Sequence, residues 1–278
     1  MKVLIISHNP VTAQSNMGKT FLTLFSSFAP EELCQIYIYP TVPNQNKCGS
    51  YYRMTDKDML QWLLKRKKIG KVISQEQVCK EAGIFEVARD EAIYRNPKNK
   101  SPARRILRDF VWKLAKWKNE ELNAWLETEK PECIFVAPGT ACFLYDIALY
   151  VAERLGIPIV TYICDEYFFV KTPGIGLDKI RVGILHKKIR KLLDHSSRLI
   201  VISEELKTEY ESYFAVPTSV VMTGSSIPIT ETANVTQNPE AICYFGNIRC
   251  NRYVSLAEIG RELDIINREQ GTDYRLKI

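Results

Sequence analysis

Short runs of β-branched residues alternate with longer helical patterns along most of the chain, and this alternation is what most constrains its fold. It is typical of βαβ units, in which helices join parallel strands and cover the sheet. The expected strands span residues 3–7, 35–39, 133–137, 157–163, 199–202, 219–222 and 242–245, and a last one opens at Arg275. The expected helices span residues 18–28, 56–64, 103–127, 140–155, 179–194, 204–213 and 253–269. We therefore predict an α/β fold with a mostly parallel sheet flanked by helices.

The expected helix at 103–127 has the most regular pattern. Its apolar residues recur at helical spacing, so they should form one stripe that faces a core. That stripe comprises Leu107, Phe110, Val111, Leu114, Trp117, Leu122 and Trp125. The opposite face carries Arg105, Arg108, Lys113, Lys116 and Lys118. A basic amphipathic helix with tryptophans can also lie on a membrane surface, so that alternative stays open.

The net charge of +6 is concentrated in one part of the chain. Residues 57–118 hold 17 Lys and Arg against 7 Asp and Glu, whereas the whole chain holds 38 against 32. Such a segment can attract anionic lipid headgroups or phosphorylated substrates, although a solvated helix face has the same composition. We expect peripheral contact with an anionic membrane through residues 57–118, and no nucleic-acid partner.

The N-terminal residues and the cysteines point to the cytoplasm. Too few apolar residues precede His8 for a signal peptide, and no apolar run reaches the ~20 residues that span a bilayer. The eight cysteines form no C-x-x-C pair, so buried reduced thiols are expected. The three histidines lack the spacing of metal ligands. We predict a cytoplasmic chain that can bind peripherally to the inner face of the membrane and has no metal and no cofactor.

Two domains are expected. Residues 1–225 form the first, and residues 226–240 read as a linker because they are polar, contain two prolines and show no period. Residues 241–278 begin a second domain with one strand, one helix and the next strand. A unit of this size cannot cover both faces of a parallel sheet. We therefore expect this domain to be truncated.

The segment after the first strand is one residue away from a phosphate-binding P-loop. It reads A-Q-S-N-M-G-K-T from Ala13 to Thr20, with alanine where that motif has its first glycine. Asp165 and Glu166 follow an apolar run and could act as a Walker B partner, so an ATPase remains an alternative. A helix N-terminus can also bind an anion or a sugar hydroxyl. In that case Asn16, Gly18, Lys19 and Thr20 would border a cleft.

Small or polar residues follow several expected strands. His8 follows the first, Gly139 the third, Asp165 and Glu166 the fourth, and Ser203 and Glu204 the fifth. Open α/β sheets bind ligands at the carboxyl ends of their strands, so these residues are candidates for an acceptor or phosphate site. Helix capping is the alternative for Ser203, because serine followed by glutamates suits a first turn. Asp165 has no evident capping role.

The order of these motifs resembles the first domain of GT-B fold glycosyltransferases. The relevant phrases are K-V-L-I-I-S-H-N-P, N-x-G-K-T, G-I-P-I-V-T-Y, an acidic pair, and S-R-L-I-V-I-S-E-E-L-K. They are most similar to the family-4-like group of capsule and exopolysaccharide synthesis. The resemblance implies a Rossmann-like first domain that binds the acceptor.

The same resemblance extends to the second domain. The segment from Tyr244 to Arg252 is similar to the turn at which the family binds the donor diphosphate. It implies that Gly246 and Arg252 face the diphosphate, with Arg249 as a possible substitute. Asn247 stands where the family has its other common basic residue. The family's E-x7-E-type segment, which binds the donor sugar late in the second domain, is expected beyond residue 278.

The resemblance implies a glycosyltransferase that moves a sugar from a nucleotide-diphosphate sugar to a saccharide or lipid-linked acceptor in surface polysaccharide synthesis. Asp165 is the candidate for contacting the acceptor hydroxyl. We expect the 278 residues alone to show little or no catalysis. An ATPase, a sugar-nucleotide epimerase and a non-catalytic glycan- or partner-binding module remain alternatives.

Overall fold

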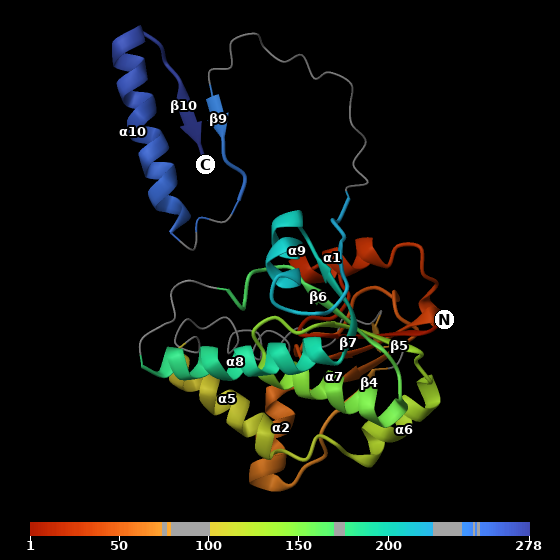
Figure 1. Cartoon of the computed structure of the whole chain (residues 1–278). Coiled ribbons are helices and arrows are strands. Elements are labelled where there is room, and N and C mark those ends of the chain that lie inside the picture. The colour runs from red at the N-terminus through yellow and green to blue at the C-terminus, as the bar shows by residue number, and fades with distance from the viewer. Residues whose placement is uncertain (74–76, 79–100, 170–175, 225–240, 247, 249–250) are drawn as a thin grey trace. The chain divides into compact units, whose positions relative to one another are not determined.

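The computed structural model describes residues 1–73, 77–78, 101–169, 176–224, 241–246, 248 and 251–278. The expected linker at 226–240 and the candidate Arg249 lie outside the described residues. The chain divides into two compact units, Met1–Ser225 and Ser226–Ile278, which are described separately. The first contains the large sheet and most of the helices (Figure 1).

An eight-stranded sheet forms the centre of the first unit. Its order is β4-β3-β2-β1-β5-β6-β7-β8, and every neighbouring pair is parallel except β3 and β4. The strands are β1 (Val3–Ser7), β2 (Leu33–Tyr37), β3 (Ser50–Arg53), β4 (Lys71–Ile73), β5 (Cys133–Ala137), β6 (Ile159–Ile163), β7 (Ser196–Val201) and β8 (Thr218–Val220). The predicted α/β class with a mainly parallel sheet is confirmed.

The strand order places a switch point next to β1. From β1 the chain adds β2 and β3 on one side, and then returns to add β5 on the other side. Ser7 at the end of β1 therefore lies beside both Tyr37 of β2 and Ala137 of β5. Loops that leave such a point in opposite directions open a crevice at the carboxyl edge of the sheet.

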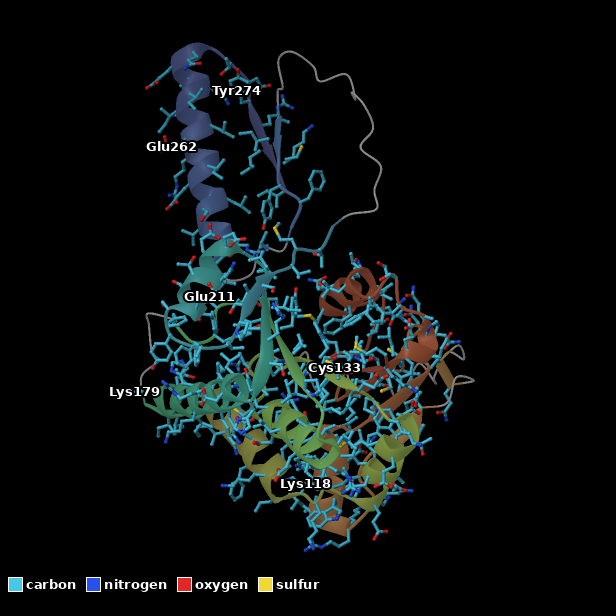
Figure 2. All side chains as sticks on the ribbon, turned by 45° about the vertical axis from the view of Figure 1, so that its right-hand side comes forward. Lys118, Cys133, Lys179, Glu211, Glu262 and Tyr274 are labelled. Carbon is cyan, nitrogen blue, oxygen red and sulfur yellow. The ribbon has the colours of Figure 1, made fainter. Side chains whose placement is uncertain are left out.

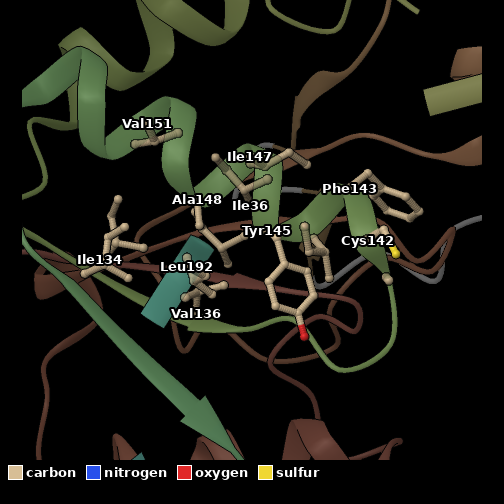
Figure 3. Close-up of a cluster of buried hydrophobic side chains, with 14 of the residues drawn as sticks. Ile36, Ile134, Val136, Cys142, Phe143, Tyr145, Ile147, Ala148, Val151 and Leu192 are labelled. Carbon is tan, nitrogen blue, oxygen red and sulfur yellow. The ribbon is translucent and has the colours of Figure 1, made fainter. Parts of the chain in front are cut away.

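Helices cover both faces of the sheet, because successive side chains of each strand point to opposite sides. Val3 and Ile5 of β1 join a core with Phe21 of α1, whereas Leu4 and Ile6 join a larger core beneath α7. Figure 3 shows part of this larger core, in which α7 packs on β2 and β5. The helices are α1 (Asn16–Leu24), α2 (Asp56–Lys65), α5 (Pro102–Leu114), α6 (Glu120–Glu129), α7 (Cys142–Leu155), α8 (Leu177–Asp194) and α9 (Glu204–Glu211), with a 3-10 turn at Pro30–Glu32.

The predicted helix at 103–127 was wrong as a single element. It is two helices, α5 and α6, because Ala115 leaves α5 in an extended conformation and the Asn119 side chain caps α6. The predicted apolar stripe is also divided. Trp117, Leu122 and Trp125 are buried, whereas Leu107, Phe110 and Leu114 are exposed. Buried Trp112 instead anchors α5 to the unit, and it stacks on Phe143 of α7 with ring centroids 4.0 Å apart.

The second unit is small. It contains β9 (Ala241–Cys243), α10 (Arg252–Gln270) and β10 (Arg275–Lys277), and the two strands pair in parallel. Leu256 and Leu263 of α10 are its buried apolar residues among those described, whereas Phe245 and Ile242 are exposed. Figure 2 shows Glu262 on α10 and Tyr274 just before β10.

The cysteines that the structure describes are free thiols. Burial raises the pKa of Cys48 and Cys142 to about 12, so these thiols stay protonated near neutral pH. Within the described ranges, no group of three or more His, Cys, Asp or Glu side chains could hold a metal ion. No helix among the described residues is long and apolar enough to cross a membrane.

Candidate functional site

A pocket of about 990 Å³ opens at the carboxyl edge of the sheet in the first unit. Its floor comes from loops that follow four parallel strands: His8 and Asn9 after β1, Pro40 beyond β2, residues 138–141 after β5, and Cys164 after β6. Helices α2, α5 and α8 supply its walls. The pocket thus occupies the switch point between β1 and β5, where the topology predicts ligand binding.

Buried Gln35 in β2 holds the loop that carries His8. Its side-chain oxygen accepts from the Val11 backbone N–H at 3.0 Å, and its amide nitrogen donates to Ser7 Oγ at 2.9 Å and to the Asn9 carbonyl at 3.1 Å. A buried amide would be costly without such partners. Gln35 therefore fixes the backbone of this loop from the neighbouring strand.

His8 is neutral at physiological pH. Burial, reinforced by the Arg108 guanidinium, lowers the pKa of His8 from 6.5 to about 4. Arg108 Nη2 lies 3.4 Å from His8 Nε2, and His8 Nδ1 lies 3.2 Å from Asn9 Oδ1. Because a guanidinium can only donate, Nε2 is the acceptor and Nδ1 carries the proton that is donated to Asn9. The single lone pair of His8 Nε2 thus faces the Arg108 guanidinium.

Arg108 is held by Asp56, the first residue of α2. The Arg108 Nε lies 2.9 Å from both carboxylate oxygens of Asp56, and the Trp112 Nε1–H donates to one of them at 2.6 Å. The guanidinium also lies over the Phe143 ring, 4.9 Å from its centroid. These contacts fix a cation beside His8 and tie α5 to α2.

A second arginine lies at the α8 wall. Arg181 is buried, and its Nη2 donates to the Thr140 carbonyl at 2.7 Å. Its Nε is 4.0 Å from Asp109 and makes no hydrogen bond with any described residue. Burial raises the pKa of the Asp109 carboxyl, against the opposing effect of Arg181. Sequence reasoning missed Asp56, Asp109 and Arg181, because no short motif connects them.

The segment that resembled a P-loop forms a capped helix. Ser15 caps α1 by accepting from the Gly18 N–H at 3.1 Å, and the Gln14 N–H donates to Thr12 Oγ1 at 3.3 Å. With the Val11 N–H bound to Gln35, these donors already serve protein acceptors. A phosphate cradle needs such N–H groups to face its ligand. Met17 lines the pocket, whereas Asn16 and Lys19 are exposed and Thr20 bonds to the Asn16 carbonyl.

Gly18 has a packing role in this arrangement. A β-carbon there would lie 2.2 Å from the Thr12 carbonyl oxygen and 2.7 Å from Ser15 Oγ. We expect Gly18→Ala to lower the free energy of unfolding by about 2 kcal/mol, because the loop must move away from α1. Chemical denaturation measures this.

Gly183→Ala is the matched control. Gly183 lies within α8 and a β-carbon there meets nothing within 4 Å, so this change should stabilise the protein by about 0.5 kcal/mol. Equal effects of the two substitutions would contradict the close approach of Thr12 to Gly18.

The candidates after β5 and β6 lie at or near the pocket. Gly139 lines it in a left-handed conformation, with φ of +54°, and accepts from the Tyr145 hydroxyl at 2.7 Å. Asp165 is exposed and accepts from the hydroxyl of Tyr167, a lining residue, at 3.2 Å. Glu166 bonds the backbone N–H groups of Phe168 and Phe169, so one of its oxygens holds the turn after β6.

The remaining candidates lie elsewhere. Ser203 caps α9 by accepting from the Leu206 N–H, and Glu204 belongs to the first turn of that helix. In the second unit, Arg252 is the first residue of α10 and is exposed. A β-carbon on Gly246 would lie 2.7 Å from the Tyr244 hydroxyl, so the tyrosine lies close over this glycine.

Comparison with known proteins gives a distant likeness in fold. No family model matches the chain, and no curated protein matches it. Among solved structures, apo UGT2 of Phytolacca americana matches 95% of this chain at 12% identity and a TM-score of 0.40. UGT89C1 of Arabidopsis thaliana matches 92% of it at 13% identity, with TM-scores of 0.42 in its complex with UDP-L-rhamnose and 0.40 with quercetin. The chain spans 54% to 62% of the length of these structures.

Proposed function

We propose that this chain provides the acceptor-binding part of a glycosyltransferase, which moves a sugar from a nucleotide-diphosphate sugar to a saccharide or lipid-linked acceptor. One observation carries the proposal: the large pocket lies at the switch point of the sheet and is lined by His8 and Tyr162, two residues of the motifs that resemble GT-B enzymes. We extend the proposal to surface polysaccharide synthesis, and the only basis for this step is the order of the family-4-like motifs.

Roles follow from the contacts of each group. An acceptor hydroxyl would take the place of Arg108 Nη2 at the lone pair of His8 Nε2 and donate a hydrogen bond to it. Asp165 stays the candidate for contacting that hydroxyl at the rim, since Tyr167 links its carboxylate to the lining. Arg252 is the proposed contact for the donor diphosphate in the second unit. Catalysis would come from holding the acceptor hydroxyl and the anomeric carbon together while cations stabilise the departing diphosphate.

The test is sugar transfer by the complete gene product. It would be incubated with a panel of nucleotide-diphosphate sugars and with saccharide and lipid-linked acceptors, and products would be followed by mass spectrometry. We expect transfer from one donor, and loss of most of it in His8→Ala with no change in Glu127→Ala, an exposed substitution on α6. Isomerised donor without any acceptor would instead identify an epimerase, and ATP hydrolysis an ATPase.

We also propose that the first unit contacts an anionic membrane, with α5 as the main contact. Phe110 and Leu114 are exposed on this helix, and Ile180 is exposed on the neighbouring α8. The same two helices carry exposed lysines: Lys113 on α5, and Lys179 at the start of α8, which Figure 2 labels. Apolar side chains that enter the headgroup region, flanked by cations, suit an anionic bilayer surface.

Co-sedimentation with vesicles tests this contact. We expect binding to vesicles that contain phosphatidylserine, weaker binding at high salt, and little binding to pure phosphatidylcholine. The double variant Phe110→Ser, Leu114→Ser should bind about tenfold more weakly, because two apolar side chains no longer enter the bilayer. Val72→Ser, an exposed apolar substitution on β4, is the control. Equal binding by both variants would rule out α5 as the contact.

A further inference from the structure

The two carboxylates that follow β6 lie in different surroundings. Asp165 is exposed at the rim of the pocket, and its Oδ2 accepts from the Tyr167 hydroxyl at 3.2 Å. Glu166 is partly buried, and its Oε2 is buried completely. One carboxylate of this acidic pair is therefore available to a ligand, whereas the other belongs to the interior of the turn formed by residues 164–169.

Two residues of this turn line the pocket, Cys164 and Tyr167. The Tyr167 hydroxyl lies 3.9 Å from Cys164 Sγ, and a β-carbon on Gly139 would lie 3.9 Å from the same hydroxyl. Tyr167 thus reaches from the end of β6 to the loop that follows β5. Because its hydroxyl also binds Asp165, the place of both side chains depends on where the backbone of the turn lies.

Glu166 fixes that backbone from the inside. Its Oε1 accepts from the N–H groups of Phe168 at 2.5 Å and of Phe169 at 2.6 Å. Hydrogen bonds to an ionised carboxylate are roughly twice as strong as those between neutral groups. One side chain thus holds two consecutive peptide units of the turn.

The same two phenylalanines pack into an aromatic cluster between α8 and α9. Phe168 lies against His186 of α8 and Phe214 beyond α9, with ring centroids 4.7 Å and 5.0 Å apart. Phe169 lies against Tyr210 of α9 at 5.3 Å. The end of the turn that Glu166 binds is therefore packed on two helices of the first unit.

Tyr210 also interacts with Glu166. Burial raises the pKa of Tyr210, and the charge of Glu166 adds to this rise, whereas the Tyr167 backbone N–H opposes it. The hydroxyl stays protonated near neutral pH and lies within electrostatic reach of the carboxylate. Glu166 Oε2 makes no hydrogen bond with any described residue. A nearby O–H dipole stabilises a buried carboxylate, so Tyr210 should support the ionised form that holds the turn.

We propose that Glu166 is a positioning residue, which holds Tyr167 and Asp165 at the pocket by fixing the backbone of the turn after β6, and that Tyr210 supports Glu166 from α9. The role of Tyr167 and Asp165 as contacts of the acceptor rests on the proposed function, but the state of the turn can be measured without sugar transfer. Without this carboxylate, two backbone N–H groups lose their acceptor and the turn can leave its place.

The Cys164 thiol reports on the turn in the 278-residue chain. Burial, followed by the charge of Asp165, raises the pKa of this thiol, so it should react slowly. We expect Glu166→Ala to speed its alkylation by iodoacetamide about tenfold, because the released turn exposes the thiol. Glu166→Gln keeps an oxygen for both N–H groups and should speed alkylation about twofold at most. Peptide mass spectrometry measures the rates, with the exposed Cys243 as internal standard.

Glu209→Ala is the matched control. Glu209 is exposed on α9, directly before Tyr210, and should leave the alkylation rate of Cys164 unchanged. The same rate in Glu209→Ala and in a folded Glu166→Ala would overturn the proposal.

The buried Cys34 and Cys48 separate a local change from unfolding. Both have no exposed surface, so they should react only when the first unit opens. If Glu166→Ala exposes them as well, Glu166→Asp decides. Its shorter side chain keeps the charge but reaches the two N–H groups less well, so Cys164 should react about threefold faster while Cys34 and Cys48 stay protected. An unchanged rate in Glu166→Asp would then overturn the proposal.

Tyr210→Phe tests the support from α9. It should speed alkylation of Cys164 about threefold in the otherwise unaltered chain, and should have no effect in Glu166→Ala, because the carboxylate on which it acts is then absent. Equal factors in both backgrounds would remove Tyr210 from the proposal.

Sugar transfer by the complete gene product tests the consequence for the site. Glu166→Ala should raise the KM for the acceptor about tenfold and leave the KM for the nucleotide-diphosphate sugar unchanged, because the donor contacts are proposed for the second unit. A rise in both KM values would contradict a positioning role. Faster alkylation of Cys164 without transfer to any acceptor would remove the proposed function and keep the role of Glu166 in the turn. Transfer with an unchanged acceptor KM in Glu166→Ala would remove the positioning role and keep the glycosyltransferase.

Discussion

Asp56→Ala should lower the free energy of unfolding by about 3 kcal/mol. The substitution removes the carboxylate that both Arg108 and the Trp112 indole contact. The Asp56 and Arg108 side chains are only 24% and 29% exposed. Removing one partner of such a pair costs more than the pair contributes, because the other charge stays partly buried. Urea denaturation measures the change.

Two further variants test whether the lost charge of Asp56 causes this loss of stability. Asp56→Asn keeps an acceptor oxygen for Trp112 but loses the charge, so its cost should be intermediate. Glu127→Ala breaks the ion pair with Arg154, where the glutamate is 62% exposed, and should cost no more than about 0.5 kcal/mol. If Asp56→Ala were as mild as Glu127→Ala, the Asp56–Arg108 contact would not hold α5 to α2.

The second large effect is a loss of stability in acid that arises from His8. The pKa of His8 is about 4 in the folded chain, against 6.5 for an unperturbed histidine. As the pH falls below 6.5, the unfolded chain takes up a proton on His8, whereas the folded chain does so only near pH 4. The free energy of unfolding should therefore fall across this interval, by up to about 1.4 kcal/mol per pH unit and about 3 kcal/mol in all.

The measurement is urea denaturation at several pH values between 7 and 4. His8→Gln should remove this part of the slope, whereas His195→Gln, an exposed substitution at the end of α8, should keep it. Arg108→Gln should raise the pKa of His8 in an NMR titration, because it removes a nearby cation. The same acid slope in His8→Gln and in the unaltered chain would show that His8 does not have the lowered pKa.

The sequence predicts the centre of the sheet well and its edge poorly. The expected ranges 3–7 and 133–137 match β1 and β5, because strands buried on both faces need continuous apolar residues. The strands β3 and β4 were missed. Ser50–Arg53 carries tyrosines between polar residues, and Lys71–Ile73 is a short edge strand. Strands of this kind depend on a neighbour that the local sequence does not reveal.

The break between α5 and α6 had a visible signal. Asn119 followed by two glutamates is a good helix start, and the structure uses it as one. The long apolar repeat obscured it, since a helical period alone cannot tell a core-facing side chain from one on a solvent-exposed face. Leu107, Phe110 and Leu114 continue the repeat on the outside of the unit.

The pocket was predictable in position but not in composition. Its floor follows from the strand ends, so His8 and Gly139 could be singled out in advance. Its walls could not, because Asp56, Arg108 and Arg181 belong to three helices far apart in the chain. Ser203 matches the alternative interpretation, that of a helix cap. The roles of Arg249 and Arg252 stay predictions.

The pocket has a floor that is held by the buried amide of Gln35 and a wall of exposed side chains on α2. Three hydrogen bonds organise the His8 loop before any ligand arrives, so binding there need not be opposed by the entropy of ordering a flexible segment. On the α2 wall, Leu60 and Leu64 are 47% and 80% exposed, so neighbouring side chains restrict their rotamers little. Selectivity for the reacting hydroxyl would then come from the preorganised floor, and tolerance toward acceptors of different size from the exposed leucines of α2.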